Sequence, residues 1–159
     1  MAVEGLKICK QDGFARELAE NHAYRMAEVL ETTSDIWENY CSEKSTRGNI
    51  SMHDYGWSAL GDTTLLIETV LGIRTYALEH EVAWNPMPEK CGIRRLPYRD
   101  GRIELSQQPE RGRIFVRAVL PTGTKLNYCA GKYEYTYISD GRPHFFDYPL
   151  TAVGEEEHR

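Results

Sequence analysis

One carboxylate in this sequence stands in an aromatic setting of the kind that binds sugars. Glu38 lies between Trp37 and Tyr40 in the segment Ile-Trp-Glu-Asn-Tyr, directly before a polar loop. Flat apolar faces of pyranose rings stack on Trp and Tyr, while sugar hydroxyls seek carboxylates and amides such as that of Asn39. Hydrolysis of a glycosidic bond generally needs two carboxyl groups, one as an acid and one as a base or nucleophile. Glu38 is a candidate for one of these groups.

A second cluster, His53-Asp54-Tyr55-Gly56-Trp57-Ser58, directly precedes an apolar helical pattern. Antiparallel helices return the chain to a common rim, so this cluster could meet Glu38 at one end of a helical hairpin. Both motifs also have purely structural interpretations. A Glu after a Trp is more often a solvated residue or a helix cap than a catalyst. The cluster itself suits a hydrophobic staple at a helix start equally well.

Two helical patterns bound the loop between these clusters. Apolar residues recur at spacings of three and four from Asp12, a possible cap, and predict an amphipathic helix of about five turns. A second helix with a wider apolar face is expected from about Trp57 to Leu71, with Gly72 as its stop signal. The polar loop from Cys41 to about Asp54 is longer than most connections, as functional loops often are. The predicted apolar face of the first helix comprises Phe14, Leu18, His22, Met26, Val29 and Leu30.

After Gly72 the pattern alternates with a period of two, which predicts strands of an antiparallel sandwich. The fold class expected is α+β: helices of an incomplete barrel at 1–73, an antiparallel β-rich domain at 74–150 and a disordered tail at 151–159. Two helices cannot close a core, so further helices are expected outside this chain. The predicted strands are 81–84, 102–105, 113–119, 125–128 and 133–138.

Composition excludes several classes of function. The chain has 159 residues and a net charge of −5 with scattered basic residues, which argues against nucleic-acid binding. No apolar run is long enough to span a membrane and no signal peptide is visible, so a cytoplasmic protein is expected. The His residues are not at ligand spacing, and no metal or cofactor is expected. The four cysteines form no CxxC pair and are expected to be free thiols, and they are Cys9, Cys41, Cys91 and Cys129.

The order of these motifs resembles the end of the (α/α)6 barrel in clan G glycoside hydrolases. Trp-Glu-Asn-Tyr, a Gly-containing polar loop, Tyr-Gly-Trp-Ser and an apolar helix ending in Gly-Ile follow one another between residues 14 and 73. The resemblance is to the trehalase and the glucosidase or mannosylglycerate hydrolase-like families, thirty-seven and sixty-three. It implies that Glu38 is the general base, with Asn39 and Tyr40 around it. It also implies that Trp37, Tyr55, Gly56 and Trp57 contribute to sugar binding.

The family's general acid, an Asp, lies on an earlier part of the barrel, and neither Asp35 nor Asp54 matches it. The resemblance therefore implies a fragment of an inverting glycosidase that lacks its N-terminal barrel portion, acts on a carbohydrate and is inactive alone. The β-rich part is also similar to modules of α-L-rhamnosidase-like enzymes. A further alternative is a non-catalytic carbohydrate-binding or interaction module that uses Tyr133, Tyr135 and Tyr137, which alternation places on one strand face. The interpretation favoured for this stripe is that it faces the sandwich core.

Overall fold

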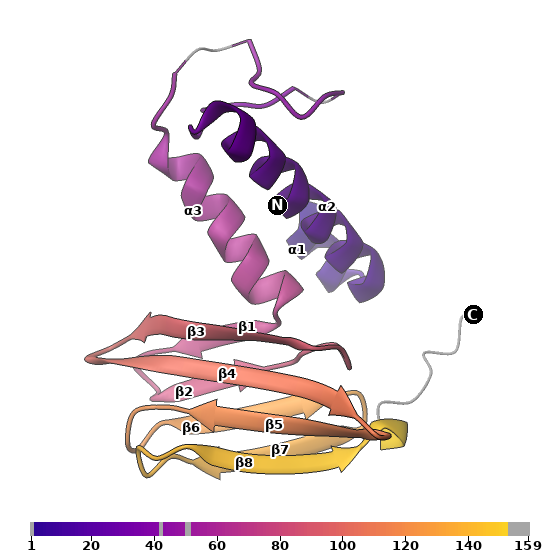
Figure 1. Ribbon diagram of the computed structural model, residues 1–159, viewed down its shortest axis with the longest axis vertical. Helices are drawn as coiled ribbons and strands as arrows, with labels where there is room; N and C mark the ends of the chain where they lie inside the picture. The colour runs from indigo at the N-terminus through magenta and orange to yellow at the C-terminus, as the bar shows by residue number, and fades with distance from the viewer. Residues whose placement is uncertain (1, 42, 50–51, 153–159) are drawn as a thin grey trace. The chain divides into compact units, whose positions relative to one another are not determined.

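The computed structural model describes residues 2–41, 43–49 and 52–152, and the chain forms two compact units, Met1–Val70 and Leu71–Arg159 (Figure 1). The first unit is helical and the second consists of two four-stranded sheets. The α+β class is thereby confirmed.

The helical unit is built from two short segments packed along one long helix. Its elements are α1 (Ala2–Ile8), α2 (Asp12–Thr33), α3 (Gly56–Thr64) and η1 (Leu65–Val70), a π-helical turn that continues α3. Elements α1 and η1 both pack on α2. The centre of the packing is formed by Val3, Ala15 and Ala19, with Leu6, Leu65 and Val70 against them.

The buried face of α2 differs from the predicted one. The buried positions are Ala15, Ala19 and Val29, whereas Phe14 and Leu18 of the predicted apolar face are exposed. Alanines in the interface let neighbouring backbones approach closely, and this gain outweighs the size of the larger side chains at the adjacent positions. The predicted cap is also wrong, because Asp12 is the first helical residue and Gln11 is the N-cap without a side-chain bond. An acidic residue in the first turn still favours the helix dipole.

The second predicted helix is present as α3 followed by η1. Gly72 lies just beyond it with a φ of +69°, and its carbonyl accepts a 2.8 Å hydrogen bond from the amide of Asn85. A positive φ of this kind is what glycine tolerates best. Much of the apolar side of this helix remains exposed, including Trp57, Leu60 and Leu66.

The second unit is a sandwich whose two sheets face one another (Figure 1). One sheet has the order β1-β2-β6-β7 and the other has the order β3-β4-β5-β8. All neighbouring strands are antiparallel except β2 and β6, which pair in parallel, so the predicted purely antiparallel arrangement is wrong at this one pair. The strands are β1 (Ile73–Tyr76), β2 (Glu81–Trp84), β3 (Cys91–Tyr98), β4 (Gly101–Glu110), β5 (Arg113–Val119), β6 (Lys125–Ala130), β7 (Tyr133–Ile138) and β8 (His144–Pro149).

The tyrosine stripe of β7 packs inside this sandwich. Tyr133 stacks on Tyr148 with ring centroids 4.1 Å apart, and Tyr135 stacks on Phe146 at 4.3 Å. Tyr137 stacks in the same way on His144 of β8. The stripe therefore closes one side of the sandwich core, as the favoured interpretation of the sequence holds.

The chain end and the cysteines complete the description. The predicted disordered tail begins at residue 151, but Leu150–Ala152 form a 3-10 turn, and residues 153–159 lie outside the described part of the chain. All four cysteines are free, as expected. Within residues 2–41, 43–49 and 52–152, none of the helices combines the length and apolar character that crossing a bilayer requires.

Candidate functional site

The long loop after α2 folds back on itself and joins the two predicted motif segments. The amide of Glu38 donates to the carbonyl of Met52 over 3.1 Å, and the amide of Tyr55 donates to the carbonyl of Ile36 over 3.0 Å. The hydroxyl of Ser58, in the first turn of α3, donates to the carbonyl of Glu38 over 3.3 Å. These bonds tie the backbone around Glu38 to the start of α3.

The backbone of Glu38 is part of this framework, whereas its carboxylate makes no polar contact with the described residues. The side chain is half-buried. Among the residues that the structure describes, no hydrogen-bond or ion-pair partner lies within reach of its carboxylate. Its backbone is bonded at both its amide and its carbonyl, whereas its carboxylate remains available to a ligand or to water.

Three neighbours of Glu38 hold the loop in shape. The hydroxyl of Tyr40 accepts a 2.9 Å hydrogen bond from the amide of Trp37 and closes a tight turn around Glu38. The Trp37 indole donates to Thr33 over 3.2 Å, and the guanidinium of Arg47 lies 5.3 Å from the centroid of its ring. One side of the Trp37 ring is thereby covered by a cation, so its role in the structure is largely to organise the loop.

Asn39 is fixed against a glycine on the returning part of the loop. The Gly48 amide donates to the carbonyl of Asn39 over 2.9 Å. Beside this bond, Tyr40 and Arg47 form an isolated antiparallel β-bridge through their backbones. A Cβ on Gly48 would lie 2.1 Å from the side-chain oxygen of Asn39. A larger residue here would force the Asn39 side chain to move, so glycine suits a loop that folds back on itself.

The two aromatic residues at the start of α3 differ in how far they are exposed to solvent. Tyr55 is the N-cap residue of α3 and is half-buried, and Gly56 is the first helical residue. Trp57 is 76% exposed, so its ring is open to a stacking partner. Of the residues predicted to bind sugar, Trp57 is thus the most accessible aromatic.

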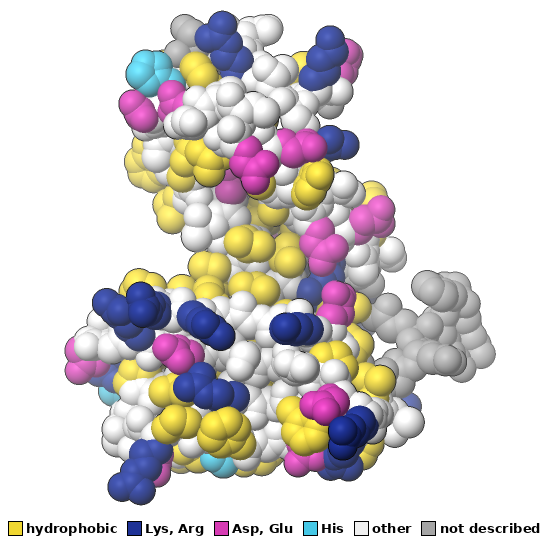
Figure 2. Space-filling view, viewed as in Figure 1, with side chains coloured by type: hydrophobic (Ala, Val, Ile, Leu, Met, Phe, Trp, Pro, Cys, Tyr) yellow, Lys and Arg dark blue, Asp and Glu magenta, His cyan; other side chains and the backbone are white. Residues whose placement is uncertain are grey.

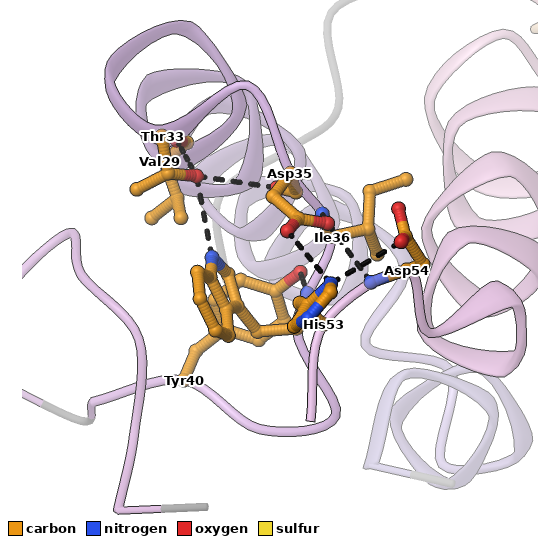
Figure 3. A network of polar contacts seen from close by, with 8 residues as sticks. Val29, Thr33, Asp35, Ile36, Tyr40, His53 and Asp54 are labelled. Carbon is orange, nitrogen blue, oxygen red and sulfur yellow. Dashed lines mark hydrogen bonds and ion pairs between the residues drawn. The ribbon is translucent and has the colours of Figure 1, made fainter. Parts of the chain in front are cut away.

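A polar network that the sequence interpretation did not include links the two ends of the loop (Figure 3). One carboxylate oxygen of Asp35 accepts hydrogen bonds from the amides of Asp54, at 2.9 Å, and of Ile36, at 2.7 Å. These bonds, and then the nearby His53 imidazole, hold the pKa of Asp35 below its ordinary value. The other oxygen of Asp35 lies 3.4 Å from Nδ1 of His53, which is also 3.2 Å from Asp54.

Asp35, His53 and Asp54 form a group that could hold a metal ion, since one ligand atom from each lies within 4.8 Å of the others. Spacing in the sequence excluded metal ligands, and it missed this group because a loop brings together residues that are far apart along the chain. His53 is also within ion-pair distance of the same two carboxylates. Both His53 and Asp54 are exposed, so the geometry alone fits a surface ion pair as well as a metal ligand set.

A pocket of about 420 Å³ opens beside the loop in the helical unit. It is lined by the α2 residues His22 and Met26 and by Tyr40 and Cys41 of the loop, and Glu38 is not among its lining residues. Hydrogen bonds from the amides of Glu43 and Lys44 lower the pKa of the Cys41 thiol. Burial raises the pKa of the Tyr40 phenol.

The loop around Glu38 and the pocket beside it are the geometric features by which the chain can be compared with known proteins. Comparisons with protein-family models, with curated proteins and with solved structures found no match. The class to which the loop and the sandwich belong therefore has to be argued from the residues described above.

Proposed function

We propose that this chain is the base-bearing C-terminal part of an inverting glycoside hydrolase of the trehalase and family sixty-three type. In this proposal, Glu38 deprotonates a water molecule, which attacks the anomeric carbon of a carbohydrate substrate. An Asp from a barrel portion outside this chain protonates the leaving oxygen. The chain alone is inactive because it supplies only one of the two carboxyl groups.

The observation that carries the proposal is the loop framework around Glu38. Its amide and carbonyl are both bonded to the 52–58 segment, while its carboxylate has no partner among the described residues. A general base must be placed reproducibly and yet be free to accept a proton, and this arrangement fixes the backbone of Glu38 while leaving its carboxylate free. A Glu in a loop without such bonds would have no comparable backbone anchoring.

The surroundings support a sugar as the ligand. Trp57 presents an exposed indole on the segment bonded to Glu38, and Tyr55 lies two residues earlier at the start of the helix. Stacking on such a ring stabilises a pyranose, and the fixed loop limits the entropy lost on binding. Trp37, Asn39 and Tyr40 then act mainly by holding Glu38 in place.

The inverting mechanism sets a geometric requirement on the missing partner. The two carboxyl groups of inverting enzymes stand roughly 6.5 to 9.5 Å apart, which leaves room for the water between the base and the sugar. The free side of Glu38 must then face the barrel portion that carries the acid. The exposed apolar residues Leu60 of α3 and Leu66 of η1 provide a surface for such further helices.

The decisive experiment uses the longest open reading frame that contains this chain, assayed on trehalose, α-glucosides and α-mannosides. We expect Glu38→Gln to lower kcat by at least about a thousandfold with little change in KM, because base removal acts on the chemical step. Proton NMR of the first product formed by the parent should show the anomer opposite to that of the substrate. Azide should restore turnover to Glu38→Ala and yield a glycosyl azide of that inverted configuration.

The matched control is Glu43→Gln, which removes an exposed carboxylate five residues further along the same loop. It should leave kcat within about twofold of the parent, as for most surface substitutions. Near-normal turnover of Glu38→Gln, or retention of the substrate's anomeric configuration, would show that Glu38 is not the base of an inverting enzyme.

A further inference from the structure

A second candidate site lies on the outer face of the β3-β4-β5-β8 sheet, within the sandwich unit. A depression of about 730 Å³ crosses this face, and we refer to it as the outer trough. The residues that line it and face outward are Lys90, Gly92, Arg94, Ser106, Gln108, Phe115, Arg117 and Phe145.

The register of the sheet explains why this face is hollow. Gly92 of β3 pairs with Ser106 of β4, Ser106 pairs with Arg117 of β5, and Arg117 pairs with Phe145 of β8. Side chains of paired residues point to the same face. A single row therefore runs across all four strands with two very small residues at one end and a large aromatic ring at the other.

The small end of this row is required by the backbone. A Cβ at Gly92 would lie 2.3 Å from the carbonyl oxygen of Leu105 and 2.8 Å from the Cα of Ser106. The strands approach too closely here for any side chain at this position. The floor of the trough at β3 and β4 consequently stays low while its other end is raised by Phe115 and Phe145.

At the apolar end of the trough, two phenylalanines on adjacent strands face outward into solvent, although large apolar side chains usually lie in the core. Phe115 is 46% exposed and Phe145 is 67% exposed. Together they offer two flat apolar surfaces beside the polar row. Exposed aromatic rings flanking a polar depression are typical of ligand-binding faces.

The other end of the trough is cationic. Lys90 and Arg94 are exposed, and neither has an ion-pair partner among the described residues. Arg117 in the middle is paired with Glu104 over 3.1 Å, so its charge is already balanced. No acidic residue is among the described residues that line the trough. Basic side chains lie among hydrophobic ones on this face of the sandwich (Figure 2).

We propose that the outer trough binds an acidic oligosaccharide, with a sugar face on Phe145 and Phe115 and a uronate carboxylate near Lys90 and Arg94. The two unpaired cations in a chain of net charge −5 select an anionic ligand, and the rings select one with flat apolar faces. The row runs across the strands, whose backbone groups are used within the sheet. A peptide that docks by adding a strand would gain no backbone bonds there, which favours a glycan.

This inference does not rest on Glu38, because the trough belongs to the sandwich unit alone. The test is titration calorimetry of the full chain with tetragalacturonate, with maltotetraose as the neutral analogue and hexaglutamate as the acidic peptide. We expect saturable binding of tetragalacturonate that weakens as salt increases, because exposed charge pairs are screened. Maltotetraose and hexaglutamate should bind at least about tenfold more weakly, since each lacks one of the two features.

Two substitutions locate the ligand, and each has a matched control. Phe145→Ala should raise the Kd at least about threefold through the lost stacking, whereas Ile138→Ala on β7, also 67% exposed, should leave it unchanged. Arg94→Gln should raise the Kd by a similar factor and flatten the salt dependence, whereas Arg142→Gln, in the turn before β8, should do neither. Circular dichroism of each variant verifies that the sandwich is folded, and Ser106→Leu, which fills the trough, gives an independent block.

Several outcomes would overturn the proposal. These are no saturation by tetragalacturonate up to about 10 mM, a range that includes weak ligands, equal binding of maltotetraose, or preferred binding of hexaglutamate. Binding that is unchanged by Arg94→Gln and Ser106→Leu would place the ligand elsewhere. Loss of binding in Glu38→Gln would likewise show that the glycan occupies the helical unit, so the two proposals fail separately.

Discussion

A buried hydrogen-bond network under the outer trough gives the sharpest stability prediction. The hydroxyl of Tyr128 on β6 donates to the side-chain oxygen of Gln107 on β4 over 2.7 Å and shares a 2.5 Å hydrogen bond with the hydroxyl of Tyr148 on β8. The Gln107 amide group in turn donates to the carbonyls of Met87 and Glu89. All three side chains in the network are nearly fully buried, so the network joins both sheets away from bulk solvent.

Tyr128→Phe removes the one hydroxyl on which both partners depend. The ring and its edge-on contact with Trp84, at 5.3 Å between centroids, are preserved, so cavity formation does not contribute. The side-chain oxygen of Gln107 loses its donor and the Tyr148 hydroxyl loses its partner. A buried polar group left unsatisfied costs about 1–3 kcal/mol, and partial relaxation of two such groups gives an expected loss of about 2 kcal/mol in the free energy of unfolding.

Urea unfolding followed by Trp84 emission measures this loss, with Trp37 and Trp57 replaced by Phe in both proteins so that only the sandwich is observed. Burial raises the pKa of Tyr128 far above neutrality, so the effect should not change between pH 6 and about 8. Tyr137→Phe is the control, since its hydroxyl bonds to the exposed Asp140, and it should cost under about 0.5 kcal/mol. A loss below that figure for Tyr128→Phe, or equal losses in the two variants, would refute the reasoning.

Two further predictions concern the helical unit and the junction residue. The imidazole of His22 donates to Asp62 over 2.7 Å, which raises the pKa of His22, so this contact stabilises the unit below the unfolded pKa near 6.5 and is lost as pH rises through the folded pKa. Because the histidine is nearly half exposed, the loss between pH 6 and about 8 should be only about 0.5 kcal/mol, and pH-dependent urea unfolding of His22→Gln should not show it. Gly72→Ala should destabilise by more than about 1 kcal/mol, because φ is +69° and the new Cβ would lie 2.0 Å from the Asn85 carbonyl. Gly61→Ala, in α3 with no atom within 4 Å of the added Cβ, should instead stabilise by about 0.5–1 kcal/mol, and thermal unfolding compares the two.

The sequence predicted all or part of β2, β4, β5, β6 and β7, whereas it missed β1, β3 and β8. Residues 81–84, 113–119 and 133–138 alternate cleanly, and they match β2, β5 and β7. Strand β3 was missed because a register shift between Ile93 and Leu96 breaks its alternation and Pro97 follows. Both are features of an edge strand, whose irregularity is tolerated since only one side is paired.

Helix packing was less predictable, because the face that is buried depends on what packs against it. Ala15 and Ala19 carry little hydrophobic signal, yet they are fully buried under α1 and η1. Helix α1 was missed for a related reason, since Val3 and Leu6 are too few to show a period in seven residues. Likewise, the Asp35 network depends on backbone amides that no side-chain pattern reports.

The exposed apolar residues of α3 and η1 bear directly on the proposed function. Trp57 and Leu60 lie three residues apart in α3, Leu66 lies in η1, and all three are substantially exposed. A single exposed apolar residue needs no explanation, whereas several on one continuous helical segment are costly in water unless another surface covers them. Small alanines fill much of the buried core of the helical unit, so larger apolar residues remain on its surface, where a partner could cover them. This division is expected if α1 and α2 stabilise the chain's own helical unit while α3 and η1 meet further helices, as the proposed function requires.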